Sequence, residues 1–196
     1  VLVKDAAALE ALESVDTIVI DKTGTLTEGK PKVVSVAAVN DFSEADVLRF
    51  AASLERGSEH PLAAAVVAAA ESRGIATVMP ENFQSITGKG VRGMVGDRMA
   101  SLGNDALFAD RGVDLSALHA EAARLREDGQ TVMFLGVEGV PRGVIGVQDP
   151  IKATTAEAVK RLRDEGLRVV MLTGDSRATA LSVAKKLGID DVLAEV

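Results

Sequence analysis

The chain has 196 residues, a formal net charge of −7 and no cysteine. This length allows one large domain or two small ones, each with its own core. The negative charge argues against binding to nucleic acid, because phosphate neutralisation requires a basic surface. The lack of cysteine excludes disulfides and thiolate metal sites. The most apolar window, residues 62–70, is about half of the roughly 20 residues that a membrane span needs. We therefore expect a soluble α/β protein.

The first part of the chain alternates between helix and strand patterns. Apolar residues at helical spacing predict a helix over 5–13, and the β-branched run 17–20 predicts a buried strand. A loop of small and polar residues then leads to a predicted strand at 33–36. Ser43 is expected to cap a helix that ends near Arg56, and Pro61 to begin a helix that ends near Arg73.

The middle of the chain reads as β segments broken by glycines, with a helix predicted over 114–128. The segments read as strands are 83–86, 91–96, 98–103, 131–137 and 143–147. Together with the helices before them, these strands predict an α+β domain built on an antiparallel sheet.

After Asp149 the helix–strand alternation returns. Thr154 and Glu157 predict a capping box for a helix that ends near Gly166. A buried strand, a tight turn and a further helix are predicted to follow over 167–172, 173–175 and 176–187. This alternation is typical of a parallel sheet. Residues 1–31 and 148–196 are therefore expected to form one doubly wound α/β domain, with the antiparallel domain, 32–147, inserted between them.

Two strands of the predicted parallel sheet end in polar residues. Asp21 follows the first strand, and Thr173, Gly174 and Asp175 follow the strand at 167–172. In open parallel sheets the reactive site lies outside the carboxyl ends of the strands. A carboxylate at that place can serve as a metal ligand, a base or a nucleophile.

Residues 21–27, DKTGTLT, match the phosphorylation motif of P-type ATPases at every position. The resemblance implies a haloacid-dehalogenase-like fold in which Asp21 attacks the γ-phosphate of ATP and becomes an aspartyl-phosphate. It also implies that Lys22, Thr23, Thr173, Gly174 and Asp175 belong to the same catalytic site. Asp21 and the main chain of Thr23 would hold Mg²⁺. Asp149 and Lys152 resemble the segment that returns the chain from the inserted domain, although a solvated turn is an equal alternative.

Three further segments resemble the nucleotide-binding domain of heavy-metal-transporting P-type ATPases: SEHP at 58–61, GKG at 88–90 and GN at 103–104. By that resemblance an adenine pocket is lined by Glu55, His60, Gly88, Gly90, Val91, Gly103 and Asn104. Glu55 could accept a hydrogen bond from the adenine amino group, and glycines allow close approach of a flat ring. His60 could instead cap a helix. A dinucleotide fingerprint is rejected, because β structure rather than a helix follows the glycines. Glu59 is expected to orient His60, and His119 to lie on the surface.

The resemblance covers nearly the whole chain, but the family's GDGxNDxP segment, transmembrane helices and actuator domain are not in this sequence. The expectation is therefore the ATP-binding portion of a heavy-metal pump at the cytoplasmic face of a membrane. ATP and Mg²⁺ are its expected cofactors, and the parent protein's own transmembrane and actuator domains its expected partners. Copper is the favoured ion, bound outside this portion, and little steady-state ATP hydrolysis is expected.

Two alternative functions stay open. One is a soluble phosphatase of the haloacid-dehalogenase class, which Thr23 disfavours because such enzymes place an acid/base aspartate there. The other is a nucleotide-binding module without turnover.

Overall fold

The computed structural model describes residue 10 and residues 13–196. Its chain divides into two compact units: the described part of Val1–Gly29 with Ile151–Val196, here called unit 1, and Lys30–Pro150, called unit 2. The predicted domain boundaries lie close to these limits. The predicted helix at 5–13 falls almost entirely outside the described residues.

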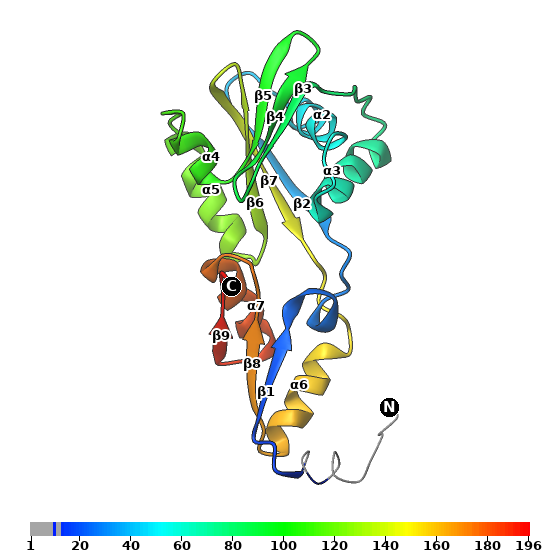
Figure 1. Ribbon diagram of the computed structural model, residues 1–196, viewed down its shortest axis with the longest axis vertical. Helices are drawn as coiled ribbons and strands as arrows, with labels where there is room; N and C mark the ends of the chain where they lie inside the picture. Colours follow the sequence, from blue (N-terminus) through cyan, green and yellow to red (C-terminus); the bar gives the residue numbers. More distant parts are fainter. Residues whose placement is uncertain (1–9, 11–12) are drawn as a thin grey trace. The chain divides into compact units, whose positions relative to one another are not determined.

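Unit 1 contains the predicted parallel sheet, but the strand predicted to be buried at 17–20 is not: it lies at the edge of the sheet, and Val19 is 57% exposed. The strands β1 (Thr17–Asp21), β8 (Arg168–Leu172) and β9 (Asp191–Leu193) pair in the order β1-β8-β9. The helices α6 (Thr155–Asp164) and α7 (Arg177–Leu187) pack on this sheet and on each other (Figure 1). The core side chains that they bury include Leu26, Val159, Val169, Met171, Val183 and Leu187.

The start of α6 corrects one prediction. Thr154 has helical backbone angles and its side chain makes no capping hydrogen bond, while Glu157 accepts a hydrogen bond from Arg161 at 2.6 Å. The hydroxyl of Thr155 instead donates to the Leu26 carbonyl oxygen at 2.7 Å. The predicted capping box is therefore wrong, because a contact with a distant loop fixes this helix start.

Unit 2 is built on a six-stranded antiparallel sheet in the order β2-β7-β6-β5-β4-β3. Its strands are β2 (Lys32–Ala38), β3 (Glu81–Ile86), β4 (Gly90–Val95), β5 (Arg98–Gly103), β6 (Thr131–Val137) and β7 (Val140–Gln148). Its helices are α2 (Glu44–Glu55), α3 (Pro61–Ser72), α4 (Asp105–Ala109) and α5 (Ser116–Glu127). Figure 1 shows α2 and α3 on one side of the sheet and α4 and α5 on the other.

The central strand β6 shows why this sheet has two cores. Met133 and Leu135 pack into the cluster under α2 and α3, whereas Val132 and Phe134 pack into the cluster under α4 and α5. A strand covered on both faces reads as a continuous apolar run. The run TVMFLGV follows from this position.

The predicted helix starts in unit 2 are confirmed. The Ser43 hydroxyl accepts from the Asp46 amide at 3.1 Å, and the Asp46 carboxylate accepts in return from the Ser43 amide. Pro61 occupies the first turn of α3.

Across residue 10 and residues 13–196, no helix has both the length and the apolar character needed to cross a bilayer.

Candidate functional site

The predicted catalytic residues of unit 1 meet at the carboxyl end of the parallel sheet. Asp21 at the end of β1 is paired in register with Leu172 at the end of β8. Thr173, Gly174 and Asp175 follow Leu172 directly. The sheet therefore brings together Asp21 and Leu172, which lie 151 positions apart in sequence, and it leaves Asp21 exposed to solvent.

A buried ion pair joins these two segments. The Lys22 ammonium group contacts the Asp175 carboxylate, and the two side chains are only 9% and 17% exposed. The Thr173 hydroxyl donates to the same carboxylate at 3.0 Å, and the Asp175 amide donates back to that hydroxyl at 3.2 Å. Exposed Asp21 is thus followed by Lys22, whose ion pair with Asp175 joins it to the turn after β8.

The turn after Asp21 is held by its own hydrogen bonds and by the returning chain. Gly24 has a φ of +77°, which favours glycine. The buried Thr27 hydroxyl accepts from the Gly24 amide at 3.2 Å and donates to the Lys22 carbonyl oxygen at 3.0 Å. The Lys152 ammonium group donates to the Gly24 carbonyl oxygen at 2.6 Å. The sequence did not show this contact with Gly24, because no local pattern links positions so far apart.

The oxygen atoms at this end of the sheet are of the chemical kind that Mg²⁺ prefers. This ion is usually bound by one or two carboxylates together with substrate phosphates. The exposed Asp21 carboxylate and the main chain of Thr23 provide such a partial set. No group of three or more His, Cys, Asp or Glu residues suited to a metal occurs in the described part of the chain.

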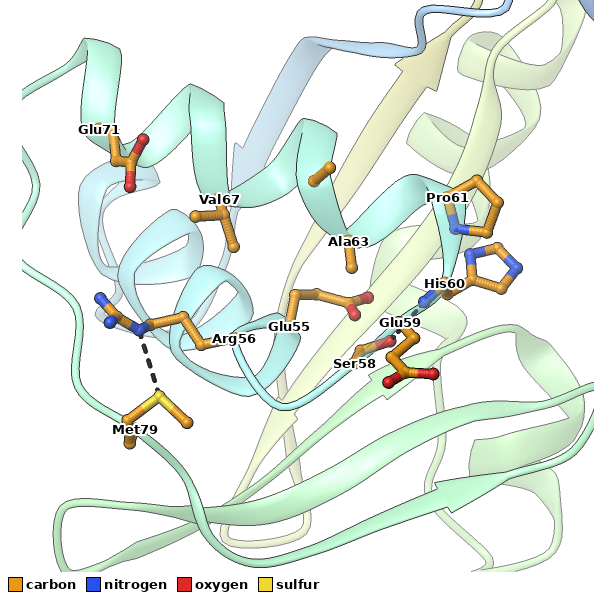
Figure 2. Close-up of a pocket in the computed structure, with 11 residues that line it drawn as sticks. Glu55, Arg56, Ser58, Glu59, His60, Pro61, Ala63, Val67, Glu71 and Met79 are labelled. Atoms are coloured by element: carbon orange, nitrogen blue, oxygen red, sulfur yellow. Dashed lines mark hydrogen bonds between the residues drawn. The ribbon is translucent and has the colours of Figure 1, made fainter.

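The predicted nucleotide-binding residues of unit 2 fall into two groups. Glu55 and His60 line one cavity of about 530 Å³, which extends along α3. Figure 2 shows the Glu55 carboxylate beneath Ala63, with Val67 and Glu71 further along the helix. Gly88, Gly90, Val91, Gly103 and Asn104 do not line this cavity.

His60 has a structural role at one end of the cavity. Its Nδ1 atom accepts a hydrogen bond from the Leu62 amide at 3.2 Å and caps α3. The capping alternative is thereby confirmed, and contact with a nucleotide stays a prediction. Glu59 also lines the cavity. The His119 side chain is 57% exposed, which confirms its predicted surface position.

Glu55 is the buried acid of the cavity. The residue is 6% exposed, and its Oε2 atom is buried without a hydrogen-bond partner in the part of the chain that the structure describes. Burial raises the pKa of Glu55, and a hydrogen bond from Ser58 opposes this shift only in part. An unpaired buried acceptor is costly, so a ligand with a hydrogen-bond donor would be favoured at this atom.

Replacing Glu55 with glutamine should stabilise the unliganded protein at neutral pH. Because the folded-state pKa of Glu55 lies above its ordinary value of 4.5, the wild type loses stability as pH rises through the interval between these two values. The amide carries no charge, so the gain should vanish near about pH 4 and reach its full size above the raised pKa. Thermal unfolding by circular dichroism from about pH 4 to pH 8 measures it. Glu59→Gln, on an exposed residue of the same cavity, is the control that should change little.

The second group of predicted residues, here called the glycine group, is Gly88, Gly90, Val91, Gly103 and Asn104. Backbone contacts between neighbouring strands fix its conformation. Gly90 and Gly103 lie opposite each other on β4 and β5. A Cβ atom at Gly90 would overlap the Leu102 carbonyl oxygen, and one at Gly103 would overlap the Lys89 carbonyl oxygen. The pairing of the two strands therefore already requires glycine at both positions, whatever ligand they contact.

Asn104 holds this group together. Its Nδ2 atom donates to the Gly88 carbonyl oxygen at 2.8 Å, and its amide donates to the Lys89 carbonyl oxygen at 2.9 Å. Its Oδ1 atom accepts from the Leu107 amide at 3.2 Å and caps α4. The side chain thus fixes the loop 88–90 and the helix start at the same time.

Replacing Asn104 with alanine should cost about 1 kcal/mol of stability through the lost helix cap and should loosen the loop 88–90. Aspartate keeps the capping oxygen but cannot donate to Gly88. Hydrogen exchange should therefore show faster exchange of the loop amides in both variants, but faster exchange in α4 only for alanine. Equal exchange of the loop in wild type and both variants would contradict this role.

Comparison with known proteins identifies the family of this chain and its relatives. A model of the haloacid dehalogenase-like hydrolases matches residues 15–196. The chain belongs to this family. Within the family, it is 52% identical over its whole length to a copper-transporting P-type ATPase of Rhizobium leguminosarum bv. viciae and 46% identical to a silver-exporting P-type ATPase of Salmonella typhimurium. The chain covers 23% and 24% of these two proteins, so it spans about a quarter of their length.

Solved structures that resemble the chain are also P-type ATPases. The whole chain of this haloacid dehalogenase-like protein superposes on 31% of a zinc-transporting PIB-type ATPase with a TM-score of 0.77 and 32% identity. It superposes on 68% of the catalytic domain of the CPx-ATPase CopB-B with a TM-score of 0.70 and 26% identity. The predicted likeness to heavy-metal P-type ATPases is confirmed, as is the fold that combines a parallel sheet with an antiparallel-sheet domain.

Several residues of the cavity were not predicted from the sequence. Arg56, Val67 and Met79 line it beside Glu55, but none belongs to a motif. Met79 lies on the segment between α3 and β3, and the sequence carries no signal that places this segment against α3.

Proposed function

We propose that the chain is the ATP-binding and phosphorylation portion of an ATP-driven heavy-metal pump. The observation that carries this proposal is the exposed carboxylate of Asp21 at the carboxyl end of β1, within DKTGTLT and beside a buried Lys22–Asp175 pair. Relatives that transport copper and silver support a soft metal ion as the cargo, and copper is the ion we favour. The parent protein would hold this portion at the cytoplasmic face of a membrane, next to its own transmembrane and actuator domains.

In the proposed reaction, a carboxylate oxygen of Asp21 attacks the γ-phosphorus of ATP. The bond from that phosphorus to the β,γ-bridging oxygen breaks, and ADP leaves with the electron pair, so that an aspartyl-phosphate remains. Lys22, Thr173 and Asp175 hold the two strand ends together around the site. Mg²⁺, held by Asp21 and the main chain of Thr23, would neutralise negative charge between the carboxylate and the phosphate.

Thr23 supports a pump over a soluble phosphatase. A phosphatase of this class needs a carboxylate two positions after the nucleophile, where it moves the protons of hydrolysis. Threonine cannot serve as that acid or base near neutral pH. The phosphorylated chain should therefore persist, which a pump needs in order to couple phosphorylation to a change of shape.

The test of the proposed function is a calorimetric titration of ATP into the chain, with GTP as the competing nucleotide. ATP should bind at least about tenfold more tightly than GTP. Two variants separate the roles of His60: asparagine retains a capping oxygen but removes the imidazole, whereas alanine removes both. Weaker ATP binding in both variants would support contact with the ring, and weaker binding in alanine alone would assign His60 to capping. A wild type that does not bind ATP would contradict the proposal.

A further inference from the structure

The cavity beside Glu55 continues beyond any residue that the proposed function uses. Past Glu55 its lining includes the apolar side chains of Ala63, Ala64 and Val67 on α3 and of Met79, together with the charged residues Arg56 and Glu71. Its volume of about 530 Å³ lies within the range of about 300–1,000 Å³ typical of pockets for drug-sized ligands.

The wall opposite α3 is fixed in place by polar contacts. The Nε atom of Arg56 donates to the Met79 sulfur at 3.4 Å, and its guanidinium donates to the Thr77 hydroxyl at 3.1 Å. The Val78 amide donates to the Ser53 hydroxyl at 3.2 Å. The Met79 side chain nevertheless remains 60% exposed. Because Met79 is fixed in position and still exposed, its thioether can pack against an aromatic ring.

Glu55 provides a buried hydrogen-bond acceptor in the same cavity. The residue is only 6% exposed, and its buried Oε2 atom has no hydrogen-bond partner among the described residues. If Glu55 accepts one hydrogen of the exocyclic amino group of adenine, the second hydrogen of that group lies in the same cavity. A substituent that replaces the second hydrogen would then extend toward Ala64, Val67 and Met79.

We propose that this cavity is a specificity pocket for N6-substituted adenine nucleotides, with Ala64, Val67 and Met79 as the walls that receive the substituent. This inference rests on the proposed function, because it takes the ligand of Glu55 to be an adenine nucleotide. It adds a substrate class, ATP analogues with an aromatic group on N6, and names the side chains that select it.

The experiment compares ATP with N6-benzyl-ATP by calorimetric titration into the full chain. The wild type should bind N6-benzyl-ATP within about threefold of ATP or more tightly. Ala64→Phe, which fills the cavity from α3, should weaken N6-benzyl-ATP at least about tenfold and change ATP by less than about twofold. The matched control is Ala68→Phe, one turn further along the same helix on an exposed residue outside the cavity, which should change neither affinity.

The outcomes separate this inference from the proposed function. A wild type that binds ATP but binds N6-benzyl-ATP more than about tenfold more weakly would overturn the inference alone. Equal effects of Ala64→Phe on both nucleotides, or equal effects of Ala64→Phe and Ala68→Phe, would also overturn it. A wild type that binds neither nucleotide would overturn both proposals. Circular dichroism of the two phenylalanine variants checks that each remains folded, as expected for substitutions of exposed alanines.

Discussion

Asp21→Asn should abolish transfer of phosphate from ATP to the chain. The amide cannot act as the nucleophile that forms an acyl phosphate, and removal of a catalytic nucleophile typically costs several orders of magnitude in rate. The measurement is a single-turnover reaction with ATP labelled on its γ-phosphate, stopped with acid. Label on the wild-type chain should be released by hydroxylamine, as expected for an acyl phosphate, and label on the variant should stay at background.

A matched control uses the other end of the same strand. Asp16 is an exposed acid just before β1, so Asp16→Asn removes the same charge without touching the proposed site. This variant should take up label as the wild type does. Equal label on Asp21→Asn and wild type would rule out Asp21 as the nucleophile, and an unlabelled wild type would contradict phosphorylation of this chain.

The substitution Lys22→Met should destabilise unit 1 by about 2–3 kcal/mol. Removal of one partner from a buried ion pair leaves an uncompensated charge, which costs about 3–5 kcal/mol when the pair is fully buried. Here the Asp175 side chain keeps 17% exposure and a hydrogen bond from Thr173, so we expect a cost at or below the lower end of that range. Because the chain contains neither Trp nor Tyr, hydrogen exchange of the β1 and β8 amides is the suitable measurement. Their opening should become about 30–150-fold more frequent.

Two further variants test whether this cost belongs to the ion pair. Lys160→Met breaks the exposed pair with Asp164, whose side chains are 75% and 61% exposed, and it should cost no more than about 0.5 kcal/mol. Adding Asp175→Asn to Lys22→Met removes the carboxylate charge that faced the ammonium group and should recover at least about 1 kcal/mol relative to additivity. Strictly additive effects would show that the loss at Lys22 comes from packing alone.

The candidate site of unit 1 could be predicted from the sequence to a large extent. A β-branched run that ends in Asp21, together with a second run that ends in Thr173, already places two polar segments at one edge of a parallel sheet. The seven-residue motif adds the chemistry. The Lys22–Asp175 pair was beyond prediction, because its members lie 153 positions apart and no periodic pattern records which ammonium group meets which carboxylate.

The site of unit 2 was predicted less completely. Glu55 and His60 do share a cavity, as the resemblance implied, but the glycine group is organised by the pairing of β4 with β5. Sequence alone could not distinguish a glycine that admits a ligand from one that admits a neighbouring strand, since both lack a Cβ atom for the same steric reason. No sequence pattern indicates that Met79 lines the cavity, because its position depends on the hydrogen bond from Arg56 to its sulfur atom.

What the sequence determined by itself are the features set by neighbours a few residues apart. These include the Ser43 cap, the Pro61 helix start, the strand at 131–137 and the strand that ends in Asp21. Only the tertiary structure decided the start of α6, the short elements α4 and β9, the Lys22–Asp175 pair and the cavity along α3. The physical reason is that periodicity and capping act over one or two turns of chain, whereas these last features depend on contacts between segments that are distant in sequence and therefore leave no local pattern.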